Sequence, residues 1–328
     1  MQVAYEVLHL LSDGKFHSGT LLAQHLGVSR SSIWKGIAFL RKLELPIQSV
    51  TGRGYRWFAP TELLHKKTIM AALTPKAQEC LGRLDVVNVV TSTNDYLIQR
   101  LAHGIPSGTV CVAEGQTAGR GRMGRQWRSP IAANIYLSLY WRLPTKLHDL
   151  SGLSLIAGLA VLEALKSLVI LPPDLGIKWP NDIWYQSAKL AGILTESIGC
   201  GNTTDVIIGI GLNVSMPSAE KSNPLWTSLE NIFGITLSRN QLIAQILNVL
   251  VDLLDCFQQQ GFAAFMPLWA DYDLLFNKTI QLSHEQLTQV GIAKGVNQRG
   301  ELCVQMGDTM KAIRSGEVSV RPQEKVIA

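Results

Sequence analysis

Residues 116–128 hold the densest group of side chains in the sequence that could perform chemistry. They read QTAGRGRMGRQWR, in which glycines alternate with Arg120, Arg122, Arg125 and Arg128. Arginine presents a planar fork of N–H donors that fits carboxylates and phosphates, and glycine lets the backbone approach a ligand closely. The stretch therefore predicts a flexible loop that binds a ligand with several anionic groups.

Two other interpretations of this loop have to be weighed. Gly119, Gly121 and Gly124 form G-x-G-x-x-G, which in a dinucleotide site links a strand to a helix and is followed by an acidic residue about 20 positions later. Here 135–141 is predicted as a strand, and no acidic residue lies between 115 and 148. A dinucleotide site is therefore disfavoured. A solvated charge run or a non-specific nucleic-acid patch stays open from this loop alone.

A second polar group lies where a predicted strand meets a helix. Ser92, Thr93 and Asn94 follow the apolar run 84–90 and precede a helix that ends at Gly104. A simple helix cap is one explanation. The start of a helix also presents free N–H groups to a polar ligand, so these residues are candidates for binding.

Two further features lie in the second half of the central region. Lys178 precedes Trp-Pro-Asn-Asp, where proline restricts the turn; a solvated lysine at a structural turn is the alternative. Gly209 and Gly211 interrupt the apolar strand 205–214, which indicates close approach by a ligand or another segment. Asn213 is expected at the end of that strand with its amide available.

The first 60 residues are predicted to form a winged helix-turn-helix. They hold seven Lys and Arg against three Asp and Glu, a net charge of +4 out of the total of +5. Helices are expected to begin after Ser18 and Ser29, which places the helix-turn-helix at about Gly19 to Ala38. The short runs 46–51 and 55–58, joined by Gly-Arg-Gly, predict the wing. The candidate DNA contacts are Ser29, Arg30, Ser31, Ser32, Lys35, Arg53 and Arg56. A small helical protein-interaction domain is the alternative.

Composition limits the class of protein. With 328 residues, 47% of them hydrophobic and 17% charged, the chain is expected to be an ordinary globular protein of two or three domains. The five cysteines are scattered and never spaced C-x-x-C, so we expect no disulfide framework or zinc site, and a cytoplasmic setting. The amino terminus does not resemble a signal peptide, and charges interrupt the apolar run 153–171, so no membrane span is expected.

The elements that position these motifs divide the chain into three parts. Strands at 84–90, 109–113, 134–141, 175–178, 183–185, 189–198 and 205–214 alternate with helices at 61–73, 149–169, 239–260 and 262–272, which predicts an α+β central domain. Short alternating runs at 279–282, 287–293, 301–306 and 317–321 predict a small β-barrel. The expected domains are therefore 1–62, 63–277 and 278–328.

The order of the central motifs is similar to that of one enzyme family. Ser-Thr-Asn at 92–94, Gln116, GRGR-x-GR-x-W at 119–127, KWPND at 178–182, KLAGIL at 189–194 and GIGLNV at 209–214 resemble biotin–protein ligases. With a winged helix in front, nearly the full length resembles the bifunctional ligases that also repress the biotin operon. The resemblance implies a catalytic domain like that of class II synthetases and an SH3-like C-terminal barrel.

The resemblance also implies a reaction. Biotin and ATP, with Mg²⁺ on the nucleotide and no metal held by the protein, would form biotinyl-5′-adenylate and pyrophosphate. The biotinyl group would then pass to a lysine of the biotin carboxyl carrier protein of acetyl-CoA carboxylase. The adenylate would act as corepressor by favouring a homodimer that binds operator DNA. A pure ligand-sensing regulator and a ligase for another acid, such as lipoate, are the competing hypotheses.

The family's residue roles transfer to matching positions. The biotin site is implied to contain Ser92, Thr93, Asn94, Gln116, Arg120, Gly121, Arg122 and Lys178. The ATP and adenylate site is implied to contain Arg122, Arg125, Lys178, Lys189, Asn213 and Trp226, with Trp226 near adenine. Lys178 and Arg122 are the implied catalytic cations. Met123 departs from the more basic loop that the family leads one to expect, and the resemblance implies no role for it.

Overall fold

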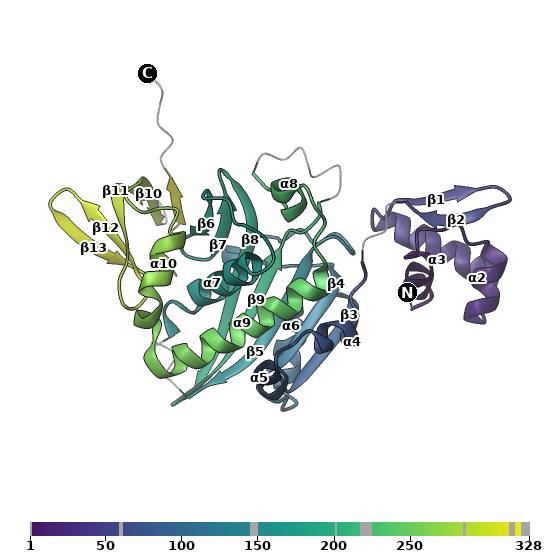
Figure 1. Cartoon of the computed structure of the whole chain (residues 1–328), viewed down its shortest axis with the longest axis horizontal. Coiled ribbons are helices and arrows are strands. Elements are labelled where there is room, and N and C mark those ends of the chain that lie inside the picture. Colours follow the sequence, from purple (N-terminus) through teal and green to yellow (C-terminus); the bar gives the residue numbers. More distant parts are fainter. Residues whose placement is uncertain are drawn as a thin grey trace, which may run out of the picture.

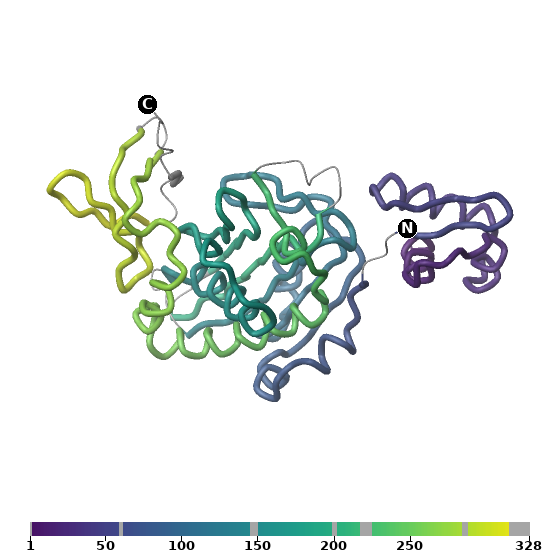
Figure 2. Tube along the Cα trace, turned by 45° about the horizontal axis from the view of Figure 1, so that its top comes forward, coloured from purple at the N-terminus to yellow at the C-terminus, as the bar shows by residue number. Residues whose placement is uncertain are grey.

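Three folded units follow one another along the chain (Figure 1). The computed structural model describes residues 2–58, 62–144, 150–200, 202–216, 225–284, 287–314 and 319–322. The N-terminal and C-terminal units lie at opposite ends of the central α/β unit in two views (Figures 1 and 2). This is the α+β multidomain architecture that the sequence predicted. The junction expected at 59–61 lies outside the described residues, and the domain limits stay predictions.

The N-terminal unit contains three helices and a hairpin. These are α1 (Gln2–Leu11), α2 (Gly19–Leu26), α3 (Arg30–Lys42), β1 (Ile47–Val50) and β2 (Gly54–Trp57). The Ser18 and Ser29 side chains accept hydrogen bonds from backbone N–H groups in the first turns of α2 and α3, which fixes where both helices begin. Arg41 donates to Ile47 O at 2.8 Å and to Ser49 Oγ at 2.6 Å, so it braces the wing against α3.

The central unit is built on a seven-stranded mixed sheet with strand order β3-β4-β5-β9-β8-β7-β6. Its strands are β3 (Arg83–Val90), β4 (Thr109–Gln116), β5 (Ile135–Leu143), β6 (Leu175–Lys178), β7 (Asp182–Tyr185), β8 (Ala188–Cys200) and β9 (Thr203–Leu212). Only the β3–β4 pair is parallel among these seven strands. β3 and β4 therefore end on the same edge, which brings the start of the next helix beside the loop that follows β4.

The two faces of this sheet differ. Helices α7 (Leu153–Lys166) and α9 (Arg239–Gln260) pack on one face and share the main core with alternate strand residues such as Val110, Leu139 and Ile208. Helix α6 (Thr93–Leu101) packs on the opposite face. There Leu97 clusters with Cys111, which lies between the core residues Val110 and Val112 on β4. Because side chains alternate along a strand, the α6 face carries the other set of strand residues, which includes Ser138, Gly209 and Gly211.

The long helix α9 could cross a membrane by its length and apolar composition alone. Within its most apolar window, however, 61% is buried inside the fold, and Figure 1 shows it lying along the central sheet. Its apolar stripe belongs to the main core, which is the ordinary reason for such a stripe in a globular protein.

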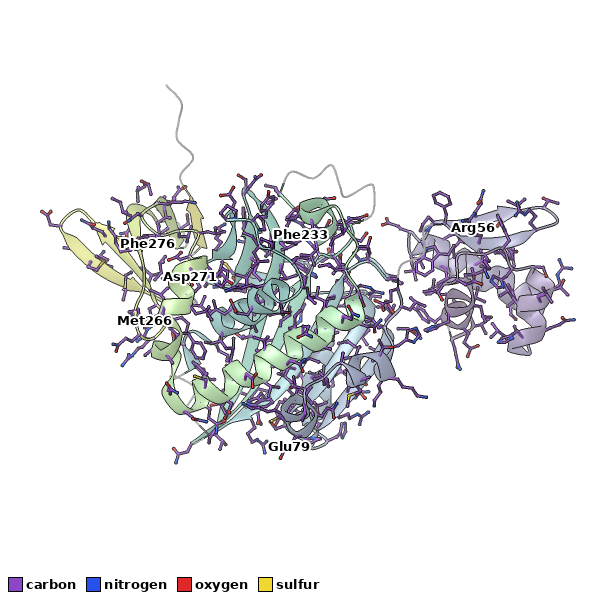
Figure 3. All side chains as sticks on the ribbon, in the orientation of Figure 1. Arg56, Glu79, Phe233, Met266, Asp271 and Phe276 are labelled. Carbon is purple, nitrogen blue, oxygen red and sulfur yellow. The ribbon has the colours of Figure 1, made fainter. Side chains whose placement is uncertain are left out.

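The C-terminal unit is a five-stranded antiparallel sheet with order β13-β12-β11-β10-β14. The strands are β10 (Thr279–His284), β11 (Leu287–Val296), β12 (Leu302–Met306), β13 (Thr309–Ile313) and β14 (Ser319–Pro322). Its buried residues join the main core, and Trp179 Nε1 donates to Gly300 O at 3.0 Å. The unit therefore packs directly behind the Trp-Pro turn. Figure 3 shows Phe276 and Asp271 at this end of the molecule.

Several predicted element limits were wrong. The helix expected at 61–73 is the shorter α4 (Lys66–Ala71), followed by α5 (Pro75–Cys80), because Thr74 and Pro75 start a new helix. The helix expected at 262–272 is a 3₁₀ turn, η3 (Phe262–Phe265), and then α10 (Met266–Tyr272). Helix α8 (Leu229–Phe233) and strand β13 were not predicted. The single-turn η1 (Arg122–Gly124) lies within the arginine loop.

Candidate active site and DNA-binding surface

A row of residues across five strands forms the floor of the candidate active site. The hydrogen-bond register aligns Tyr136, Gly211, Gly192, Asp182 and Lys178 on β5, β9, β8, β7 and β6. Directly paired residues point to the same face of a sheet, and this face is the one that carries α6. The two adjacent glycines leave space at the middle of the row for a bulky group.

The start of α6 is held by a network of short hydrogen bonds. Gln116 Oε1 accepts from Thr93 N at 2.8 Å and from Thr93 Oγ1 at 3.2 Å. Ser138 Oγ lies 2.7 Å from Thr93 Oγ1 and 2.6 Å from Asn94 Oδ1. Ser92 caps the helix, and it also lines the adjoining cavity. The capping and ligand-facing interpretations of Ser92 are therefore compatible.

The arginine loop folds back on itself between β4 and β5. Gly121 N donates to Arg125 O at 2.7 Å, and Trp127 N donates to Gly119 O at 2.8 Å. Met123 at the tip has φ of +56°, in the left-handed region, and its side chain is 74% exposed. The loop is therefore a small hairpin-like flap, and Met123 forms the exposed turn at its tip.

Arg120 is tied to two carboxylates beneath this flap. Its Nη2 lies 2.5 Å from Asp95 Oδ1 and 2.9 Å from Glu196 Oε2. Glu196 Oε2 also accepts from Asn94 Nδ2 at 2.7 Å. Burial lowers the pKa of Arg120, but the two carboxylates outweigh burial and raise it. Arg120 thus joins the flap, the start of α6 and strand β8.

Arg122 points from the flap towards the 178–182 turn. Its Nη1 donates to Asn181 Oδ1 at 3.2 Å, and Asn181 Nδ2 donates to Ile193 O at 2.6 Å. Burial lowers the pKa of the Arg122 guanidinium, and nearby Arg125 lowers it further, against the opposite effect of Asp182. The group remains a cation at neutral pH. The structure thus places this cation close to the turn that carries Lys178.

Trp127 covers the glycine floor, and the sequence had suggested no role for it. A Cβ atom added at Gly211 would lie 2.6 Å from Trp127 Cε2, and one at Gly192 would lie 3.1 Å from Trp127 Cζ3. The Trp127 ring also stacks on Trp226, with 6.2 Å between centroids and 16° between planes. Its Nε1 is buried with no hydrogen-bond partner. The only signal in the sequence was the tryptophan at the end of the arginine motif.

Two lysines face the same side of the sheet with different partners. Lys189 Nζ lies 2.7 Å from Asp182 Oδ1 and 5.2 Å from the centroid of the Trp127 ring. Lys178 Nζ lies 4.0 Å from the centroid of the Trp184 ring. The predicted nucleotide-side residues Lys189 and Trp226 therefore meet near Trp127.

Asn213 follows β9 as predicted, but its amide is engaged. Its Nδ2 donates to Thr227 O at 3.0 Å, and the residue is only 2% exposed. This bond holds the segment that contains Trp226 against the end of β9. The expectation of an available Asn213 amide N–H is wrong for this structure, because the chain itself uses that group.

The cavity at the start of α6 gathers five of the predicted biotin residues. Its volume is about 30 Å³, enough for about one water molecule. It is lined by Ser92, Thr93, Asn94, Gln116, Arg120, Trp127, Tyr136, Gly192, Leu194, Gly209, Ile210 and Gly211. A larger groove of about 660 Å³ between the segment after α7 and the end of α10 contains none of the candidate residues. We therefore place the site at the small cavity, where the polar groups converge.

The N-terminal unit presents a basic surface along α3 and the wing. Arg30, Ser31 and Lys35 are exposed and Ser32 is half-buried. Trp34 on the same helix is 63% exposed. Ser29 is engaged in capping, with its Oγ 2.8 Å and 2.9 Å from the hydroxyls of Ser31 and Ser32. The predicted DNA contacts on α3 thus share one outward-facing helix start.

The wing arginines are organised by Phe16. The Arg53 guanidinium lies 4.3 Å from the centroid of the Phe16 ring, and that of Arg56 lies 5.8 Å from it. Figure 3 shows Arg56 near the wing. Stacking on one ring restricts both cations, so they are held where a backbone phosphate could meet them.

Comparison with known proteins agrees with this arrangement. Residues 86–213 match the Biotin/lipoate A/B protein ligase family, 4–56 match an HTH domain, and 277–321 match the Biotin protein ligase C terminal domain. Bifunctional ligase/repressor BirA of Escherichia coli (strain K12) is 38% identical over 326 residues, covering 98% of both chains. BirA of Bacillus subtilis (strain 168) is 31% identical, covering 93% of this chain and 94% of its own.

A solved structure shares the fold of about three quarters of this chain. Biotin protein ligase from Aquifex aeolicus in complex with biotin and ATP superposes with a TM-score of 0.64 at 30% identity. The superposition covers 74% of this chain and 99% of the Aquifex aeolicus chain. The matches to the two BirA proteins cover 98% and 93% of this chain, which includes the region that matches the HTH domain. The chain therefore belongs to the bifunctional biotin–protein ligase and repressor family.

Proposed function

We propose that this protein is an ATP-dependent biotin–protein ligase that also represses transcription of biotin synthesis genes. It would convert biotin and ATP to biotinyl-5′-AMP and pyrophosphate. It would then transfer the biotinyl group to a lysine of the biotin carboxyl carrier protein of acetyl-CoA carboxylase. The observation that carries the proposal is that Lys178 shares one row of the sheet with Gly192 and Gly211, while the arginine flap contacts both the turn after Lys178 and the start of α6. The N-terminal unit adds a winged helix to this site.

The first step brings two anions together. A carboxylate must attack the α-phosphorus of a triphosphate, so fixed cations and exact positioning are what the protein has to supply. We assign this role to Lys178 and Arg122, which lie at the turn and the flap that face each other across Asn181. No covalent intermediate with a protein nucleophile is needed.

The ring end of biotin is assigned to the cavity at the start of α6. Ser92, Thr93, Asn94 and Gln116 offer the donors and acceptors that a ureido group requires. Thr93 hydrogen-bonds to Gln116, Asn94 accepts from Ser138, and Ser92 accepts from Asp95 N. Arg120 and Gly121 would border the biotin carboxylate. Because the cavity holds only about 30 Å³, we infer that the Trp127 ring moves when biotin enters.

The nucleotide end is assigned to the region around the two stacked tryptophans. Trp226 would contact adenine, with Lys189 close by and Asn213 holding the Trp226 segment in place. Arg125, which is exposed on the flap, would cover the phosphate. Among the described residues, no group of three or more His, Cys, Asp or Glu could hold a metal. Mg²⁺ would therefore be bound chiefly by the nucleotide and water.

The regulatory half of the proposal concerns the N-terminal unit. Ser29, Arg30, Ser31, Ser32, Lys35, Arg53 and Arg56 would contact operator DNA. A homodimer favoured by bound adenylate would pair two winged helices on a two-fold site, so that the adenylate acts as corepressor by linkage. The protein would act in the cytoplasm, with the carrier protein and the operator as its partners.

Biotin-dependent exchange of pyrophosphate into ATP tests the enzymatic half. Exchange should require biotin, and lipoate should not replace it. Exchange with lipoate but not biotin would contradict the substrate assignment. No exchange with any acid, combined with tight ligand-dependent DNA binding, would instead support a pure regulator.

A further inference from the structure

Glu196 on β8 lies beside the candidate site but outside the motifs that the sequence singled out. Gly192 and Leu194 line the cavity, and Glu196 is the next residue of β8 on the same face, because side chains alternate along a strand. Its side chain is 27% exposed. A negative charge near a site that is proposed to bind two anions opposes their binding unless protein donors engage it.

The first partner of Glu196 is the buried amide of Asn94. Asn94 Nδ2 donates to Glu196 Oε2 at 2.7 Å and to Leu194 O at 3.3 Å. Asn94 Oδ1 faces the other way, where it accepts from Ser138 Oγ at 2.6 Å and where a Cβ atom at Gly209 would collide with it. A reversed amide would set Oδ1 against the carboxylate. Glu196 therefore fixes the orientation of an amide that lies on the cavity floor.

The second partner of Glu196 is Arg120 at the base of the arginine flap. Arg120 Nη2 donates to Glu196 Oε1 at 3.0 Å and to Oε2 at 2.9 Å, and Asp95 binds the same guanidinium from α6. Arg120 also forms an antiparallel bridge with Gln126, and the next residue, Trp127, covers the glycine floor. A carboxylate that holds Arg120 therefore restrains the point where the two ends of the flap meet.

The two contacts require an acceptor at both ends of the side chain. Glu196 Oε2 accepts from Asn94 and Arg120 together, and Oε1 accepts from Arg120. An ionised carboxylate accepts at both oxygens, whereas the amide of a glutamine carries a donor at one end. A glutamine at position 196 would turn its own N–H groups towards one of the two donors. An anion is thus the group that can serve both partners at once.

We propose that Glu196 is a positioning residue that couples the biotin end of the site to the arginine flap. Through Asn94 it orients the amide on the cavity floor, and through Arg120 it holds the flap over that floor. The inference rests on the proposed biotin site and extends it to a residue that need not touch either substrate. Loss of the carboxylate should therefore weaken biotin binding and adenylate retention together, with kcat at saturating biotin close to that of the wild type.

Glu196→Gln, which keeps the size of the side chain, tests this coupling. Calorimetric titration should give a Kd for biotin roughly 3- to 30-fold above that of the wild type. Rapid filtration should show biotinyl-5′-AMP dissociating about 2- to 10-fold faster, a smaller effect because Asp95 still holds Arg120. Wild-type values for both quantities, or a change in only one of them, would overturn the proposal.

Two further variants of β8 control for a general loss of structure. Ser197→Ala alters the next residue of β8, which is exposed and lies on the opposite face, so it should leave both quantities at the wild-type value. Glu196→Asp keeps the charge on a shorter side chain and should lie between the wild type and Glu196→Gln. An aspartate variant as impaired as the glutamine variant would show that the charge is not what matters.

A double-mutant comparison and an NMR measurement test the contacts themselves. Glu196→Gln should speed adenylate loss less in an Arg120→Gln background than in the wild type, because the cation that it holds is gone; an equal effect would contradict the coupling. In protein with ¹⁵N-labelled asparagine, the side-chain resonances of Asn94 should shift in Glu196→Gln but not in Ser197→Ala, and unchanged resonances would refute the contact. If the wild type neither binds biotin nor exchanges pyrophosphate, the proposed function itself fails, whatever Glu196 does.

Discussion

At the scale of the residue, Lys178 is the side chain on which the proposed chemistry depends most. Lys178→Ala removes a cation from the place where a carboxylate and a phosphate must meet. It should slow biotin-dependent pyrophosphate exchange by at least ~100-fold, equivalent to a few kcal/mol of transition-state stabilisation. Lys166→Ala, at the far end of α7 beside Glu163, is the matched control and should keep the wild-type rate.

The glycine floor gives a graded prediction at the same scale. In Gly211→Ala the new methyl group would lie 2.6 Å from two atoms of the Trp127 ring, whereas in Gly192→Ala it would lie 3.1 Å from Trp127 and Lys189. Gly211→Ala should therefore raise the KM for biotin and ATP more than Gly192→Ala, by about tenfold or more if one ligand contact is lost. Calorimetric titration with biotin checks the order, and equal affinities would show that Trp127 does not define the pocket.

At the scale of the element, the arginine flap is proposed to retain the adenylate. It is anchored by Arg120 to Asp95 and Glu196, while Arg122 reaches Asn181 from a half-buried position. Arg122→Ala should speed dissociation of biotinyl-5′-AMP by roughly tenfold or more, the worth of one charge-assisted hydrogen bond. It should also weaken ligand-dependent DNA binding.

Rapid filtration of labelled adenylate and fluorescence anisotropy with operator DNA measure these two effects. Arg83→Ala is the control, because Arg83 pairs with Asp85 at the opposite end of β3 from the flap. If biotinyl-5′-AMP dissociates from Arg122→Ala at the wild-type rate, the proposed role of the flap is wrong.

At the scale of the whole molecule, a buried ion pair fixes the chain segment that leaves the winged helix. Arg239 Nη2 lies 2.8 Å from Glu114 Oε2, with side chains only 3% and 4% exposed. Arg239 also donates to the backbone oxygens of Glu62 and Asn134, and Leu64 N donates to Glu114. The ion pair thus links segment 62–64 to β4 and to Asn134, the residue before β5.

Removing one member of this buried ion pair should lower the stability of the folded protein. Glu114→Gln leaves the Arg239 charge buried and should lower the free energy of unfolding by about 3–5 kcal/mol. Asp255→Asn breaks the exposed ion pair with Lys76 and should leave the free energy of unfolding nearly unchanged. Chemical denaturation of both variants gives the comparison, and similar midpoints would show that the buried pair contributes little.

The sequence by itself determined the local features of this protein. Helix starts at Ser18, Ser29 and Ser92 were predictable because a hydroxyl cap acts on its own first turn. The arginine loop, the 178–182 turn and the division into three parts were also predictable, because each depends on residues that are consecutive in the sequence. The family resemblance followed from the order of those local motifs.

Only the tertiary structure decided what these motifs touch. The register across β5, β9, β8, β7 and β6 places Gly211 beside Gly192 and Lys178 beside Asp182. No property of one strand specifies its neighbour's register. The same holds for Trp127 over the floor and Trp184 beneath Lys178, which come from the arginine loop and from β7. Contacts between distant segments depend on packing the whole sheet, so their partners become visible only once the chain has folded.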